Sequence, residues 1–216
     1  MRRDRGRRRI YRSRALRRRR SAFVLCVLAA LVGVVLAAGQ SRGSERVTYD
    51  RSAAAAYADT WALRTNPAYW SSPDNDCADF VSQCLAAGGL RPLTGAGGDW
   101  HENGTDFPTV AWVNCTAQER ALSAAGQGHT RYIAHITSSP PGDWAPGDVV
   151  YLGAVVDGKT EWQHVIICAG RDGGRWVYDS HTTAYLHRPL TTWYPAHFSR
   201  IRFCHIADSV SYGGRR

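Results

Sequence analysis

The spacing of apolar residues changes partway along the chain. Up to about residue 126 it has helical periodicity, and it predicts helices over 51–63, 77–87 and 116–126. From about residue 129, short runs rich in β-branched and aromatic residues predict strands over 129–136, 147–155, 161–170, 175–181 and 200–206. Helices followed by strands with short turns indicate an α+β fold, in which the N-terminal helices pack on an antiparallel β-sheet.

Polar residues next to these segments predict where the helices begin. Asp74 or Asp76 can cap the second helix. Thr116 and Glu119 have the spacing of a capping box for the third helix. Residues 88–111, which lie between these two helices, are rich in Gly, Thr and Pro, so we expect a long surface loop there.

The first forty residues have the composition of a targeting segment. Residues 1–20 hold twelve arginines and one aspartate, and residues 22–38 form an apolar run. This layout is typical of an export signal, either a cleaved signal peptide or an uncleaved anchor. We therefore expect a protein that is secreted or held at the outer face of the cytoplasmic membrane by residues 22–38. The predicted divisions are a leader (1–40), a linker (41–46), one domain (47–210) and a flexible tail (211–216).

The distribution of charge argues against a nucleic-acid ligand. The whole chain carries +9, but the leader residues 1–20 carry +11, so the rest of the chain is close to −2. The basic residues that would attract a polyanion are thus confined to the targeting segment. The remaining length suits one domain with a single core, and we expect a monomer.

Cys77 stands where a thiol can act as a nucleophile. It is the first residue of the helix predicted over 77–87, where free backbone N–H groups and the helix dipole favour an anion. The same N–H groups can bind the oxyanion of a tetrahedral intermediate. A thiol attacks only as the thiolate, so such a cysteine needs a basic partner. The alternative is a buried structural cysteine.

His164 is the best-placed base in the sequence. It precedes the apolar strand residues of EWQHVIICAG, so a rigid strand would hold it. A third group should orient its imidazole. Strand alternation puts Asp179 and His181 on the same side of the strand over 175–181, and either can be this group. A histidine with only a structural role is the alternative.

Six segments carry a resemblance to a known family. They occur in the order YDRSAAAAYADTWALRTNPAYW, DCADFVSQCLAAGG, AWVN, PGDVVYL, EWQHVIIC and DSHTTAYLHRPL. Together they resemble the putative amidase domain, a branch of the NlpC/P60- and CHAP-like group of papain-related cysteine hydrolases. The resemblance extends roughly from Tyr49 to Pro195, which is nearly the whole part that follows the leader.

The resemblance implies a papain-like core, with the nucleophile at the start of a helix packed on an antiparallel sheet. It implies Cys77 as nucleophile, His164 as base and His181 as the third polar residue, which leaves Asp179 as the second candidate for that role. The chain departs from the family pattern at Asp79, where asparagine is usual. This carboxylate would add negative charge near the thiolate.

Four further cysteines follow the leader, and export would place them in an oxidising compartment. They are Cys84, Cys115, Cys168 and Cys204. With Cys77 free they can form two disulfides in three connectivities, and Cys168 and Cys204 both lie in predicted strands. The alternative is that all four are small buried residues.

Other residues suggest a substrate groove but no bound ion. The tryptophans that flank the candidate site in sequence can line a groove for a peptide or sugar stem. They are Trp100, Trp112 and Trp162. The remaining histidines lack the close ligand spacing of a zinc site, so we expect no metal and no other cofactor. The histidines considered are His101, His129 and His135.

These observations lead to the hypothesis of an exported cysteine hydrolase of amide bonds that acts on a cell-wall peptide or glycopeptide of peptidoglycan. In this hypothesis the backbone N–H of Cys77, with a side chain such as Gln83, binds the oxyanion. One alternative is a non-catalytic cell-wall-binding or interaction module on the same fold. The other is a cysteine-dependent acyl transferase, in which an amine rather than water resolves the thioester.

Overall fold

The computed structural model describes residues 45–95, 98–124, 132–135, 140–190 and 198–212. The predicted leader, including the apolar run over 22–38, lies outside the described residues. Within the described residues, no helix combines the length and the apolar character needed to cross a membrane.

Helices form the first half of the described chain, as the periodicity predicts. Their bounds are Arg51–Trp61 (α2), Cys77–Ala87 (α3), Val110–Val113 (α4) and Cys115–Ala124 (α5). The carboxylate of Asp50 caps α2 by accepting a hydrogen bond from the backbone N–H of Ala53. Tyr57 and Trp61 lie on one face of α2, with their ring centroids 6.3 Å apart and their planes tilted by 40°. Residues four positions apart are neighbours on a helix surface, so this contact follows from their spacing.

Antiparallel strands make up the second half. The main sheet has the order β2-β7-β3-β4-β5-β6, and every neighbouring pair in it is antiparallel. The strands are Tyr132–His135 (β2), Val149–Val156 (β3), Lys159–Asp172 (β4), Arg175–Ser180 (β5), Tyr185–Pro189 (β6) and Arg200–Ile206 (β7). Asp157 and Gly158 form the turn between β3 and β4, both with positive φ, as a hairpin turn requires.

A second, two-stranded sheet joins the ends of the domain. It pairs β1 (Glu45–Thr48) with β8 (Ser209–Tyr212), and Glu45 lies opposite Tyr212. The predicted linker therefore includes two residues of a strand, and the predicted tail includes the end of another. Because this pairing joins segments far apart in the chain, no local sequence pattern predicts it.

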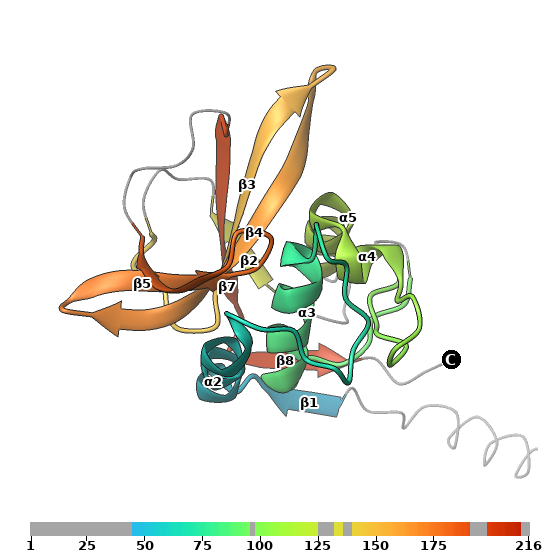
Figure 1. Cartoon of the computed structure of the whole chain (residues 1–216), viewed down its shortest axis with the longest axis horizontal. Coiled ribbons are helices and arrows are strands. Elements are labelled where there is room, and N and C mark those ends of the chain that lie inside the picture. The colour runs from blue at the N-terminus through green and yellow to red at the C-terminus, as the bar shows by residue number, and fades with distance from the viewer. Residues whose placement is uncertain (1–44, 96–97, 125–131, 136–139, 191–197, 213–216) are drawn as a thin grey trace, which may run out of the picture. The chain divides into compact units, whose positions relative to one another are not determined.

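Two apolar clusters lie on opposite faces of the main sheet. The larger one packs α2, α3 and α5 against one face, with Val149, Tyr151, Val165 and Ile167 of the sheet. The smaller one covers the other face and is centred on Trp144, Val150, Ile166 and Phe203. Figure 1 shows the helices gathered on one side of the strands. The α+β prediction, with helices packed on an antiparallel sheet, is therefore confirmed.

The segment predicted as a surface loop over 88–111 is partly buried. Leu93 pairs with Trp100 in an isolated β-bridge, and both side chains are buried together with that of Leu90. The segment also contains the start of α4. Its Gly- and Pro-rich composition correctly indicates irregular backbone, but its large apolar side chains bring it into the core.

The capping box predicted for the third helix does not form. Asn114 caps α5 by accepting from the N–H of Ala117 at 2.9 Å. The hydroxyl of Thr116 instead accepts from the backbone N–H of Trp162 at 2.8 Å and donates to its carbonyl. Thr116 therefore joins α5 to β4 rather than capping its own helix.

The five cysteines in the described residues are all free and buried, so the structure agrees with the alternative of small buried residues and not with two disulfides. Cys168 packs in the smaller cluster, whereas Cys204 packs in the larger one on the opposite face of the sheet. The two strand cysteines face away from each other across the sheet, and no pairing between them is possible.

Candidate active site

The start of α3 is held by the segment that follows β5. Asp76 occupies the N-cap position, but its carboxylate does not cap the helix. It accepts hydrogen bonds from the imidazole of His181 at 2.7 Å and from the backbone N–H of Thr182 at 3.0 Å. The hydroxyl of Thr182 accepts in turn from the backbone N–H groups of Asp76 and Cys77, each at 3.0 Å. This exchange fixes Cys77 relative to the sheet.

The sulfur of Cys77 lies beside a second sulfur. Cys77 is only 1% exposed, and its Sγ is 3.6 Å from the Sγ of Cys115. Cys77 is the first residue of α3, and Cys115 is the first residue of α5. The two sulfurs thus sit at the starts of two helices, where helix dipoles favour negative charge. The side-chain oxygen of Asn75 approaches Cys77 Sγ at 4.0 Å.

These neighbours lower the pKa of Cys77 well below that of a free thiol. The hydrogen bond from the Cys115 thiol contributes most, and the hydrogen bond with His164 and its charge follow, whereas burial acts in the opposite direction. The pKa of Cys115 is raised correspondingly by the thiolate next to it and by burial. Of the two thiols, Cys77 is therefore the one that ionises first, and Cys115 is the one that keeps its proton longer.

His164 meets Cys77 across the contact between α3 and β4. It lies in β4 and is half-buried, and its imidazole is near enough to the Cys77 thiol to lower the pKa of that thiol. The imidazole stacks on Phe198, with the rings 6.3 Å apart and nearly parallel. An imidazole that has taken the proton of a thiol leaves a thiolate that can attack a carbonyl carbon, and the imidazolium can then protonate the leaving group.

His181 does not contact His164, contrary to the prediction that it orients that imidazole. Its Nδ1 donates to Asp76 and its Nε2 donates to the carbonyl of Trp61 at 2.8 Å. Both partners accept, so both ring nitrogens carry protons and His181 is a cation. Burial opposes this charge, but the Asp76 carboxylate and the Trp61 carbonyl outweigh it and raise the pKa of His181. His181 therefore positions the start of α3.

Asp179, the second candidate for orienting His164, also points elsewhere. It is fully buried, and its Oδ1 accepts from the backbone N–H of His187 at 2.7 Å. Across the described residues, no carboxylate or amide side chain forms a hydrogen bond with His164. Stacking on Phe198 takes the place of the predicted polar contact in holding the ring.

The groups predicted to bind an oxyanion are already engaged. The backbone N–H of Cys77 donates to Thr182. The amide of Gln83 accepts from the hydroxyl of Tyr57 at 2.7 Å and donates to Asp79 at 3.0 Å. Because both ends of this buried amide have partners, Gln83 belongs to the core network, and the predicted oxyanion contacts do not form here.

Asp79 is also part of this core network. Its carboxylate accepts from the indole N–H of Trp112 at 2.7 Å and from Gln83. Burial raises the pKa of Asp79 to about 6, although these two hydrogen bonds oppose the shift. The carboxyl group is therefore directed at Trp112 and Gln83, and burial favours its neutral form.

The three tryptophans expected to line a groove are core residues instead. Trp100 is fully buried, Trp112 is 2% exposed and Trp162 is 8% exposed. The rings of Trp100 and Trp112 lie 4.8 Å apart, and the indole N–H of Trp100 donates to Ser82. These tryptophans are close to the candidate residues in sequence but do not line the site. The local backbone geometry turns their rings toward the core.

Sequence reasoning missed Cys115, Asp76, Thr182 and Asn75 as components of this site. Asp76 and Asn75 directly precede Cys77, and Thr182 follows His181, so adjacency to the candidate residues was a usable signal. Cys115 had no such signal, since it is 38 positions from Cys77 and becomes a neighbour only when the starts of α3 and α5 converge.

The lowered pKa of Cys77 can be measured by ultraviolet absorbance of the thiolate. Because the folded pKa lies below the usual value, we expect the protein to keep one thiolate below about pH 8 and to lose it as the pH falls through the folded pKa. Replacing Cys77 with serine should remove this signal. Cys84→Ser is the matched control on the same helix, since burial raises the pKa of Cys84 well above that of a free thiol. A thiolate that appears only above about pH 8.5, or that disappears in the control, would contradict this assignment.

Comparison with known families agrees with the resemblance read from the sequence. The family model described as "Putative amidase domain" matches residues 48–203, which is most of the chain. The chain belongs to this family. Membership indicates amide hydrolysis as the general activity, and the match includes both Cys77 and His164. The amidase domain thus contains all the contacts around the Cys77 sulfur described above.

A curated relative gives similarity but no activity. This chain is 28% identical over 171 residues to the "Uncharacterized protein YhbB" of Bacillus subtilis (strain 168). The alignment covers 76% of this chain and 52% of that protein, so the chain spans about half the length of this relative. No solved structure matches the chain.

Proposed function

We propose that this protein is an exported cysteine hydrolase that cleaves amide bonds in cell-wall peptides or glycopeptides. One observation carries the proposal: His164 lies beside Cys77 at the start of α3 and lowers the pKa of its thiol. In this mechanism His164 takes the proton of the Cys77 thiol, and the resulting thiolate attacks the carbonyl carbon to form a tetrahedral intermediate. The His164 imidazolium then gives that proton to the leaving amine as the C–N bond breaks. The neutral imidazole next takes a proton from water, which hydrolyses the thioester and releases the carboxylic acid and the Cys77 thiol.

The arrangement supports a papain-like core as part of this proposal. A nucleophile at the start of a helix meets a histidine on the central strand of an antiparallel sheet, with the helix packed on one sheet face. Here the third polar residue is replaced by an aromatic stack on the imidazole. The cation His181, which directly follows the neighbouring strand β5, stabilises the same helix start.

Asn75 is the donor that we propose for the oxyanion. It is exposed, and its side-chain amide approaches Cys77 Sγ at 4.0 Å. Rotation of this amide would direct its N–H groups toward an oxygen that develops next to the sulfur. Since Cys77 itself is buried, the substrate would reach the sulfur between Asn75 and the half-buried His164.

The substrate class follows from the expected location. A leader with twelve arginines in its first twenty residues and an apolar run over 22–38 supports export. Peptidoglycan is the polymer with abundant amide bonds on that side of a bacterial membrane. The amidase family supplies the bond type, and the leader supplies the compartment in which the bond is found.

Digestion of purified peptidoglycan tests the proposed function. The protein should release soluble fragments whose masses identify the cleaved amide, at a rate that depends on Cys77. Added amine nucleophiles should leave the products unchanged for a hydrolase. Amine adducts in place of carboxylic acids would assign an acyl transferase. Tight binding to the polymer without release of fragments would assign a non-catalytic wall-binding module.

A further inference from the structure

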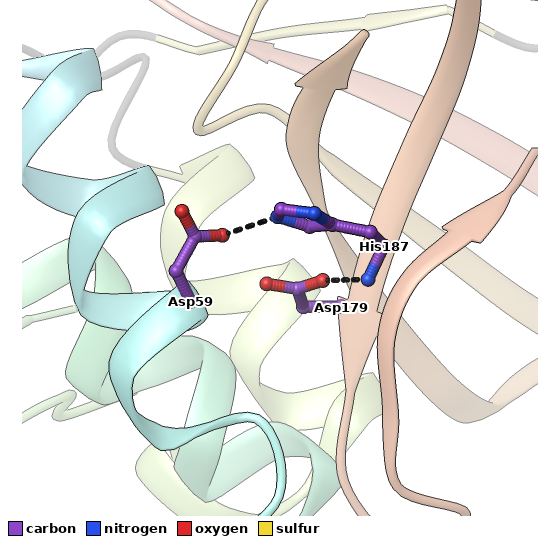
Figure 2. A group of neighbouring side chains, drawn as sticks. All are labelled: Asp59, Asp179 and His187. Carbon is purple, nitrogen blue, oxygen red and sulfur yellow. Dashed lines mark hydrogen bonds and ion pairs between the residues drawn. The ribbon is translucent and has the colours of Figure 1, made fainter. Parts of the chain in front are cut away.

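A carboxylate–imidazole cluster lies at the contact between α2 and the strands β5 and β6. It consists of Asp59 on α2, Asp179 on β5 and His187 on β6, and their ligand atoms lie within 4.8 Å of one another. Figure 2 shows both carboxylates turned toward His187, with the free oxygen of Asp179 on the side of Asp59. The cluster is separate from Cys77 and His164 and has no part in the proposed mechanism.

Asp179 is buried with an unsatisfied oxygen. One oxygen, Oδ1, accepts from the backbone N–H of His187 at 2.7 Å. The other, Oδ2, has no hydrogen-bond donor among the described residues, although the whole residue is 0% exposed. It lies against the carboxyl of Asp59, a contact that is favourable only with a proton or a cation between the two groups. A buried, unpaired carboxylate is costly, so a partner is expected in this position.

The donor set selects the kind of partner. One imidazole nitrogen and two carboxylates suit a zinc-type divalent ion, which takes His and Asp ligands at about 2.0–2.2 Å. Calcium and magnesium prefer oxygen donors alone. His187 Nε2 already lies 2.8 Å from Asp59 Oδ1, so small side-chain rotations can bring both atoms onto one ion.

Access to the cluster is open on one side. The side chains of Asp59 and His187 are 45% and 46% exposed, whereas Asp179 closes the inner side. An ion can therefore enter from solvent, with Asp179 as the inner ligand and water completing the coordination. From these observations, we propose that Asp59, Asp179 and His187 form a binding site for a zinc-type divalent cation.

The ion would join elements that also hold the candidate active site. Asp59 lies on the helix whose last residue, Trp61, accepts from His181. Asp179 lies two residues before His181 and three before Thr182, which hold the start of α3. A bound ion would link α2 to the end of β5, which is a structural role. The proposed cation site therefore does not depend on the proposed hydrolase activity.

Zinc titration of the full-length protein carrying Cys77→Ser tests the site, because the native thiolate could itself bind zinc. We expect one zinc ion per chain and a rise of the unfolding midpoint by roughly 5–10 °C at about 100 times the dissociation constant. Asp179→Asn and His187→Ala should each abolish the rise. His101→Ala is the control, since this histidine lies outside the cluster and should leave the rise unchanged.

Asp179→Asn separates loss of metal binding from loss of the fold. Its side-chain oxygen can still accept a hydrogen bond from the backbone N–H of His187, so we expect the variant to fold without metal. Cobalt substitution gives a second readout, since visible absorption bands of tetrahedral cobalt should appear and be lost in His187→Ala. Absence of stoichiometric zinc binding would overturn the proposal in favour of a proton shared between Asp59 and Asp179. A stabilisation retained in both cluster variants would also overturn it.

Discussion

Replacing Cys77 with serine should lower the rate of amide hydrolysis by on the order of 10³-fold or more. Serine nearly matches the volume of cysteine, so it fits the buried position beside Cys115. Its hydroxyl has a much higher pKa than a thiol, and neither His164 nor the helix dipole can hold it as an alkoxide. The nucleophile would be lost, while the hydrogen bonds that the backbone N–H groups of Asp76 and Cys77 donate to the Thr182 hydroxyl remain.

Cys115→Ser is the matched control for this substitution. It changes the other sulfur of the same pair, at a distance of 3.6 Å, and keeps a donor directed at Cys77. We expect this variant to keep activity within about tenfold and to shift the acid limb of its pH–rate profile. Rates of both variants on the same peptidoglycan substrate, with unfolding midpoints as a check of the fold, decide the matter. Full activity in Cys77→Ser would show that Cys77 is not the nucleophile. Activity lost only in Cys115→Ser would indicate that Cys115 is the nucleophile.

Replacing Asp148 with alanine should reduce the free energy of unfolding by about 3–5 kcal/mol. Asp148 is fully buried at the start of β3 and accepts from the guanidinium of Arg51 at 2.7 Å and the imidazole of His205 at 2.8 Å. It also accepts from the backbone N–H groups of Ile206 and Ala145, each at 2.9 Å. Removing it would leave a largely buried cation and two N–H groups without partners.

Asp208→Ala is the control for the same arginine. Asp208 accepts from Arg51 at 2.9 Å, but its side chain is 83% exposed, so the pair is screened by water. Its removal should cost less than about 1 kcal/mol. Thermal and urea unfolding of both variants measure the difference, which corresponds to a midpoint lowered by roughly 10 °C for Asp148→Ala. Equal losses in the two variants would show that burial of Asp148 adds nothing to its contacts with Arg51.

The sequence by itself determined the kinds of elements and their order. Apolar periodicity distinguished the helices of the first half from the strands of the second, because each backbone geometry turns one set of residues toward the core. It also placed Cys77 at the start of a helix and His164 in a strand. These are local properties, set by neighbours within a few positions along the chain.

The tertiary structure alone decided the partners of these residues. His181 and Asp179 lie on the predicted strand, yet they bind Asp76 and His187 rather than His164. Strand alternation fixes the face on which a side chain lies, but it does not fix which of several acceptors the side chain meets there. Cys115 likewise became the neighbour of Cys77 only through the meeting of two helix starts. Such contacts depend on how distant segments pack, since hydrogen-bond geometry requires positions accurate to fractions of an ångström.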